Sequence, residues 1–162
     1  MRRKDREVTD FNTIVRMIGE CEILRIGLAD GAFPYIVPVN FAYTAANGKI
    51  VFYVHGAMAG RKYKLMKQNG CCSFEMDIPL GMEIIEDKKD VTERYQSVMG
   101  TARIEFIEGD EKQRAMDDII MCRHEQTRGF DYNKASLARC AVAKLSVMEL
   151  TAKANAPSAP AE

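Results

Sequence analysis

The residues best suited to chemistry lie together in residues 53–65, YVHGAMAGRKYKL. A strand ending at His55 precedes a turn of small residues, and the adjacent cations Arg61 and Lys62 then open a helix. This pattern suits a phosphate monoester, because helix N-terminal N–H groups attract anions, guanidinium can bind two phosphate oxygens, and ammonium adds a point charge. Gly60 would allow the backbone to approach closely. The alternative is that both cations belong to the solvated face of a surface helix.

A second candidate is residues 36–40, IVPVN. Pro38 cannot donate to a strand ladder, and Asn40 offers both donor and acceptor groups. That combination suits the polar edge of a planar heterocycle. The alternative is a plain edge strand.

The elements that must position these residues can be predicted from hydrophobic spacing. Thr9 or Asp10 can cap a helix that ends near Gly19, because its apolar positions recur every three or four residues. A basic helix is expected within residues 57–69, ended by Gly70, and another over 110–123. Strands are expected over 22–29, 33–43, 49–56, 71–77, 95–107 and 139–150.

These elements predict a mainly β fold, an antiparallel barrel of six strands with two or three peripheral helices. Residues 1–150 are expected to form a single domain, and the Ala- and Pro-rich residues 151–162 a disordered tail. Residues 78–90 have no clear period and are predicted as a surface loop, which could hide a short strand. Gly100, inside the fifth strand, is a candidate for a bulge or a close approach.

Composition narrows the function classes. The 162 residues fit one domain, and 23 Lys plus Arg balance 23 Asp plus Glu, which disfavours nucleic-acid binding. The sequence has no apolar run of membrane-helix length and no signal peptide, so we expect a cytoplasmic protein that binds neither membrane nor nucleic acid. The five cysteines form no CxxC, so no metal site is expected.

Several segments in order carry a family resemblance. They are YIVPVNF, FYVHGAMAGRKYKLMKQN, CCSFEMD, YQSVMGTARI and KLSVMELTAK, and they span nearly the whole chain. Together they resemble the pyridoxamine 5′-phosphate oxidase-like, FMN-binding split-barrel superfamily, and within it the nitroimidazole-resistance (Nim-type) branch.

The resemblance implies a homodimer of six-stranded split β-barrels with FMN at the subunit interface. Its Arg-Lys pair, which holds the flavin phosphate, falls on Arg61 and Lys62. His55 matches a histidine beside the flavin and is the candidate catalytic residue, although it could merely pack at the barrel rim. The other implied cofactor-binding residues are Val37, Pro38, Val39, Asn40, Tyr53, Val54, Gly60 and Ser97.

The resemblance favours an FMN-dependent oxidoreductase that reduces an electron-poor small molecule. Pyridoxamine-phosphate oxidases carry a C-terminal Trp and Arg motif, and this sequence has no Trp, so we do not expect that activity. FMN is favoured over FAD because one phosphate cluster is visible and GxGxxG is absent. The alternatives are a non-catalytic carrier of flavin, deazaflavin or haem, and a dimeric scaffold that binds no ligand.

Overall fold

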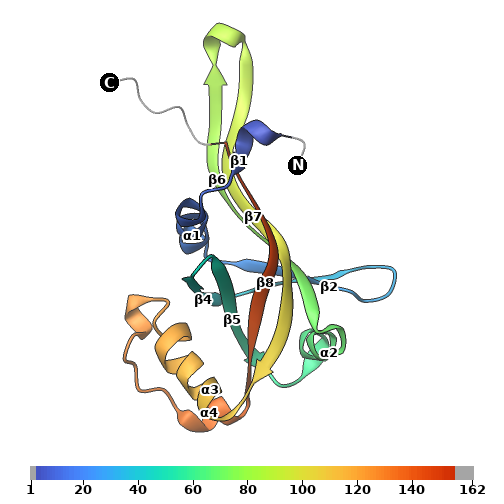
Figure 1. The fold of residues 1–162 in the computed structure, drawn as a ribbon, viewed down its shortest axis with the longest axis vertical. Helices are drawn as coiled ribbons and strands as arrows, with labels where there is room; N and C mark the ends of the chain where they lie inside the picture. The colour runs from blue at the N-terminus through green and yellow to red at the C-terminus, as the bar shows by residue number, and fades with distance from the viewer. Residues whose placement is uncertain (1–2, 156–162) are drawn as a thin grey trace.

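The computed structural model describes residues 3–155, without the side chain of Lys134, and one antiparallel sheet dominates it (Figure 1). The strands are β1 (Glu7–Val8), β2 (Leu24–Leu28), β3 (Tyr35–Val39), β4 (Phe41–Ala46), β5 (Lys49–Ala57), β6 (Cys71–Ile85), β7 (Asp90–Ile107) and β8 (Cys140–Asn155). The α-helices are α1 (Phe11–Glu20), α2 (Gly60–Asn69), α3 (Gly109–Arg114) and α4 (Lys134–Ala138). Short 3-10 turns cover Lys4–Arg6, Glu86–Lys88 and Glu125–Thr127.

The sheet has the order β3-β2-β6-β7-β8-β5-β4, with β1 paired to β8. Its two end strands, β3 and β4, are consecutive in the chain and are separated only by Asn40. The sheet therefore curls until its ends are joined by one residue, which confirms the mainly β, antiparallel split-barrel prediction. The strand predicted over residues 33–43 is divided at Asn40, and with β1 this gives eight strands in place of six.

The prediction of a loop over residues 78–90 is wrong. β6 and β7 continue through this segment as a paired hairpin that projects from the body of the fold (Figure 1). Irregularity at Gly81, which has φ +96° and lies at a register shift, explains why the segment shows no clean alternation. β8 likewise runs to Asn155, so residues 151–155 belong to the sheet, whereas residues 156–162 of the expected tail lie outside the described residues.

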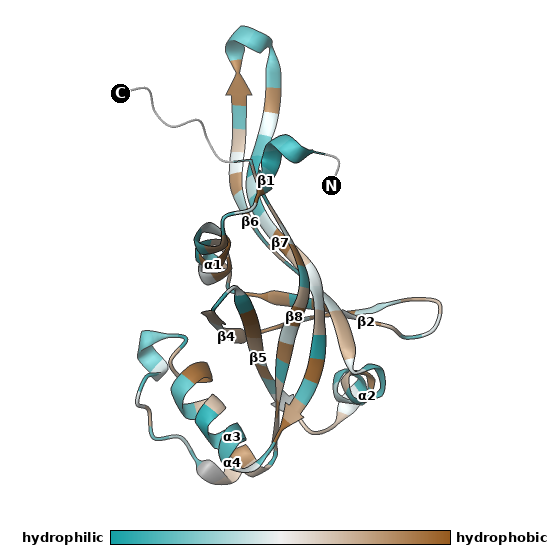
Figure 2. Ribbon diagram, in the orientation of Figure 1, coloured by the Kyte–Doolittle hydropathy of each residue, from teal (hydrophilic) through white to brown (hydrophobic). Residues whose placement is uncertain are grey.

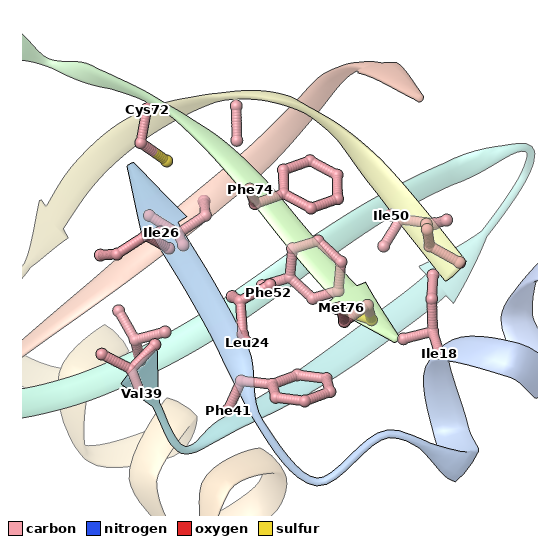
Figure 3. Packing of buried hydrophobic residues seen from close by; sticks show 14 of the residues in the cluster. Ile18, Leu24, Ile26, Val39, Phe41, Ile50, Phe52, Cys72, Phe74 and Met76 are labelled. Atoms are coloured by element: carbon pink, nitrogen blue, oxygen red, sulfur yellow. The ribbon is translucent and has the colours of Figure 1, made fainter. Parts of the chain in front are cut away.

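The core lies between the curled faces of the sheet, where large apolar side chains from most strands meet (Figure 3). Phe52 is fully buried and makes edge-to-face contacts with Phe41 and Phe74, at centroid separations of 5.6 and 5.1 Å. Gly100 is a close approach, as expected, because a Cβ there would lie 2.0 Å from the Glu149 carbonyl oxygen. The sheet thus provides a rigid support for the helices.

The helices begin and end largely where the sequence predicts. The Asp10 carboxylate caps α1 by accepting from the Thr13 N–H at 2.8 Å, and Gly70 ends α2 at φ 63°. The helix predicted over 110–123 is instead α3 followed by a π-helical segment, Ala115–Ile120. No helix among the described residues is long and apolar enough to cross a membrane.

Candidate functional site

Helix α2 begins without a side-chain cap. Its N-cap residue is Ala59, whose methyl group cannot accept a hydrogen bond, and Gly60 enters the helix at φ 89°. The first N–H groups of a helix have no partner within the helix, so here they remain available to an acceptor from outside. Arg61 and Lys62 follow in this first turn, as the sequence predicts, and α2 is largely hydrophilic (Figure 2).

A small hollow of about 10 Å³, room for about one water molecule, lies beside this helix. Its walls come from β5, α2, β7 and β8, and its lining residues are Val54, His55, Gly56, Ala57, Lys62, Tyr63, Met66, Phe106, Ala141 and Ala143. Tyr63 packs edge-to-face on Phe106, with the ring centroids 5.0 Å apart, and this pair forms an aromatic wall. The hollow is therefore mostly apolar, with His55 and Lys62 as its charged or titratable members.

Lys62 reaches over the end of β5. Its Nζ lies 3.1 Å from the point that a Cβ of residue 56 would occupy, so Gly56 leaves the room that the ammonium group uses. Partial burial, followed by the positive charge of Lys62, lowers the pKa of His55 below its ordinary value of 6.5. His55 is exposed at the rim, and a lowered pKa favours its neutral imidazole at pH 7.

Arg61 points away from this hollow, toward the turn between β2 and β3. Its Nε donates to Asp30 Oδ2 at 2.6 Å, and its Nη2 forms an ion pair with the same oxygen. The guanidinium also lies over the Tyr35 ring, 4.8 Å from the centroid. The two adjacent cations thus flank the start of α2, one against His55 and the other against Asp30.

The second predicted segment alternates between the two faces of β3. Val37 is half-buried and Val39 is buried, whereas Pro38 and Asn40 are exposed. Phe41 pairs with Val54 at the end of the β4–β5 ladder, and Asn40 and His55 are the next residues beyond this pair on the two segments. The structure therefore brings Asn40 to the level of His55.

Tyr53 and Ser97 are not brought to the hollow. Tyr53 borders a separate groove with Glu111 and Arg114 of α3. Ser97 pairs with Asp77 and Lys153 and lies nine residues along β7 from Phe106, about 30 Å at ~3.3 Å per residue. Ser97 is therefore not a lining residue of the hollow.

Sequence reasoning missed Asp30, Tyr35 and Phe106. Asp30 carried only a turn signal, from the Asp30-Gly31 pair, and nothing local indicates that this turn reaches a helix 31 positions later. Phe106 carried only a strand signal. These contacts depend on the order of the strands, which spacing along the chain does not reveal.

The buried cysteines lie outside the hollow and are structural residues. Cys71 is exposed and Cys72 is buried, as expected for neighbours in a strand. Burial raises the pKa of the Cys72 thiol to about 12 and that of Cys21 to about 11, so both stay protonated and are poor ligands or nucleophiles. Within residues 3–155, no group of three or more His, Cys, Asp or Glu side chains is placed to hold a metal ion.

Comparison with solved structures gives clear matches. A crystal structure described as a candidate 5-nitroimidazole antibiotic resistance protein from Bacteroides thetaiotaomicron is 27% identical, with a TM-score of 0.76 over 91% of this chain and 85% of that chain. A flavocytochrome from Azotobacter vinelandii is 22% identical, with a TM-score of 0.74 over 100% of this chain and 75% of that one. An FAD and haem binding protein from Mycobacterium smegmatis is 14% identical, with a TM-score of 0.77 over 95% and 76%.

No curated protein matches the chain. The sequence model of the family described as "Pyridoxamine 5′-phosphate oxidase" matches residues 10–154, which include every strand except β1 and the last residue of β8. The same range contains α2, the hollow and the turn that carries Asp30. The chain therefore belongs to the pyridoxamine 5′-phosphate oxidase family.

Proposed function

We propose that this protein is an FMN-binding flavoprotein that acts as a homodimer and reduces an electron-poor small molecule such as a nitroaromatic compound. The observation that carries the proposal is the uncapped first turn of α2, which contains Arg61 and Lys62 and lies beside a hollow lined by Lys62 and His55. Family membership supports a flavin, and the 27%-identical protein from Bacteroides thetaiotaomicron supports the choice of acceptor.

The residues present fit a flavin phosphate. The free N–H groups of α2, the guanidinium of Arg61 and the ammonium of Lys62 all belong to the first turn of the helix, and these are the donor types that a phosphate monoester prefers. The apolar wall of Tyr63 and Phe106 suits a flat or aliphatic part of the same ligand. Neighbours named for FAD, flavin or haem share the fold and are consistent with a flavin in it.

A bound flavin would supply the electron chemistry, and the chain would supply position and a proton. Arg61 and Lys62 would hold the phosphate, and Asn40 would offer an amide to the polar edge of the ring. His55 would deliver a proton to the reduced acceptor. Its lowered pKa makes the protonated imidazole a stronger acid, and the neutral form can regain a proton from solvent.

A second copy of the chain would complete the site. Ser97 does not line the hollow of its own chain, and we propose that it joins the flavin from a partner. Apolar side chains also remain exposed on the projecting hairpin and the sheet, including Met82, Ile84, Val91 and Met99. Such groups favour an interface between copies.

The first test is ligand binding. We expect the purified protein to be yellow, and the double variant Arg61→Ala/Lys62→Ala to bind FMN at least about 100-fold more weakly, because it loses two charge-assisted contacts. The matched control is Lys4→Ala/Lys64→Ala, which removes the same charge from exposed positions outside the first turn of α2 and should change affinity less than about 3-fold. Equal losses in both variants would contradict a local phosphate site.

The second test is electron transfer. Anaerobically reduced protein should be reoxidised by a 2-nitroimidazole faster than free reduced FMN is, and His55→Ala should slow the reaction about 10²-fold or more. His124→Ala is the control, since His124 lies outside the hollow. Reoxidation no faster than that of free flavin would contradict the proposed activity while leaving flavin binding intact.

A non-catalytic carrier is the second candidate, and His55 favours it as well. A neutral, exposed imidazole beside an apolar hollow is a suitable ligand for haem iron. The absorption spectrum of the purified protein separates the two, because haem gives a Soret band that flavin lacks. A Soret band lost in His55→Ala would replace the flavin proposal with a haem protein.

A further inference from the structure

The side chain of Arg61 is held on two sides by residues outside α2. Asp30 Oδ2 accepts from Nε at 2.6 Å and pairs with Nη2, so one edge of the guanidinium is occupied. Tyr35 supports the plane, with its ring centroid 4.8 Å from Cζ. Within the described residues, Nη1 has no hydrogen-bond partner.

The turn that contains Asp30 is held at both ends by contacts with other elements. Its β2 end is tied to the C-terminal end of α2 by the Asn69 amide, which donates to the Ala29 carbonyl at 2.9 Å. Its β3 end is anchored by the ladder pair Leu28 and Tyr35. Arg61 at one end of α2 and Asn69 at the other therefore fasten the same turn.

Exposure is unequal across this ion pair. The Asp30 side chain is 29% exposed, whereas that of Arg61 is 62% exposed. The carboxylate thus forms the more buried side of the pair, and the guanidinium presents its remaining edge to solvent. A guanidinium held along one edge and one face has a defined direction left for an anion.

We propose that Asp30 and Tyr35 are positioning residues, which orient Arg61 so that its Nη1 side meets a phosphate monoester. This inference rests on the proposed function, because it assumes that Arg61 contacts the flavin phosphate. Ordering a long arginine side chain before the ligand arrives removes an entropic cost from binding. Asp30 also makes the site selective, since the benefit applies only to ligands that carry the phosphate.

The contact between Asp30 and Arg61 is also compatible with the opposite role, in which Asp30 weakens phosphate binding. If Asp30 competed with phosphate for the arginine, its removal would tighten binding. The geometry favours positioning, because Asp30 occupies the Nε edge and leaves Nη1, while Tyr35 keeps the plane fixed without any charge. The two roles predict changes of opposite sign, so one measurement separates them.

The test compares the dissociation constants of FMN and riboflavin, which differ by the phosphate. The wild-type protein should prefer FMN, and Asp30→Asn should reduce this preference about 10-fold while riboflavin affinity stays the same. Tyr35→Leu should reduce it about 3- to 10-fold, and Tyr35→Phe should retain it, because the ring is what supports the guanidinium. Asp5→Asn is the matched control, since it removes an Arg–Asp pair outside the site.

The outcomes distinguish this inference from the function on which it rests. Equal wild-type affinities for FMN and riboflavin would overturn the phosphate site itself, and with it the proposed function. A preference that Arg61→Ala abolishes, but that Asp30→Asn leaves unchanged or increases, would overturn positioning alone. Should Asp30→Asn fail to fold, Tyr35→Leu and Tyr35→Phe decide the question, because equal preference in both would overturn the role of the ring.

Discussion

Two arginines in different regions of the molecule are both stacked on aromatic rings, but they are held by different kinds of partner. Arg123 lies over Phe41 and Tyr43, at 5.0 and 5.7 Å from their centroids, and donates to the carbonyl oxygens of Gly19 and Cys21 at 3.1 and 2.6 Å. Among residues 3–155, the hydrogen bonds of the Arg61 side chain go to the Asp30 carboxylate alone, and this side chain is mostly exposed. Arg123 is therefore committed to the fold, whereas Arg61 keeps donors for a ligand.

The helix N-termini in the two regions differ in the same way. α1 is capped by Asp10, which accepts from both the N–H and the hydroxyl of Thr13. α2 has Ala59 at its N-cap position and no side-chain acceptor. The difference teaches that satisfied polar groups mark the structural region, and that unsatisfied donors in the first turn of α2 mark the candidate site.

The largest expected effect that tests this contrast is on stability. Arg123→Ala should lower the free energy of unfolding by about 2 to 3 kcal/mol, because it removes two charge-assisted hydrogen bonds and the stacking on two rings. FMN affinity should change less than about 2-fold. Arg61→Ala should do the reverse, with a stability change within about 0.5 kcal/mol, since exposed ion pairs contribute little.

Urea unfolding and FMN titration of the same samples measure both effects. Arg128→Ala, an exposed arginine from the same loop as Arg123, is the control for loss of charge. Arg123→Lys should recover less than half of the loss, because lysine lacks the planar fork that reaches two carbonyls. If Arg61→Ala destabilised the fold as much as Arg123→Ala, the division between structural and ligand-binding regions would be wrong.

Local signals in the sequence were sufficient for most of the fold. The cap at Thr9 or Asp10, the stop at Gly70 and the strand over residues 49–56 each depend on a few neighbouring residues, and each is confirmed, with Asp10 as the capping residue. The hairpin over residues 78–90 was missed because the bulge at Gly81 interrupts its alternation. The π-helical turn was missed because its apolar residues have the spacing of an α-helix.

The candidate site was predictable only in part. The local sequence of residues 53–65 predicts an anion site, and His55 of β5 and Lys62 of α2 do line the same hollow. Asp30 and Tyr35 reach Arg61 only because β2 and β3 form one edge of the sheet, beside α2. The separation of Ser97 from the hollow likewise depends on the length of β7, which becomes clear only when its pairing with β6 is known.

The smallest expected effects come from substitutions at Asp10 and Ala59, the N-cap residues of α1 and α2. Asp10→Ala should lower the melting temperature by about 2 to 4 °C without changing FMN affinity. Ala59→Asp should raise the melting temperature slightly and weaken FMN binding about 5- to 10-fold, because the new carboxylate both caps α2 and repels the phosphate. Ala59→Ser is the matched neutral cap and should weaken binding less than the charged one.

The pH dependence of the α1 cap provides an internal check on this exchange. Hydrogen bonds from the Thr13 side chain and then its backbone N–H lower the pKa of Asp10 below its ordinary value of 3.8. A carboxyl with a lowered pKa stabilises the folded state above its unfolded pKa, and this contribution is lost as pH falls through the folded value. The difference in melting temperature between wild type and Asp10→Ala should therefore be constant near pH 7 and shrink below about pH 4. A difference that does not shrink at all as the pH falls below 4 would mean that Asp10 stabilises α1 by packing, and the contrast with the uncapped α2 would lose its electrostatic basis.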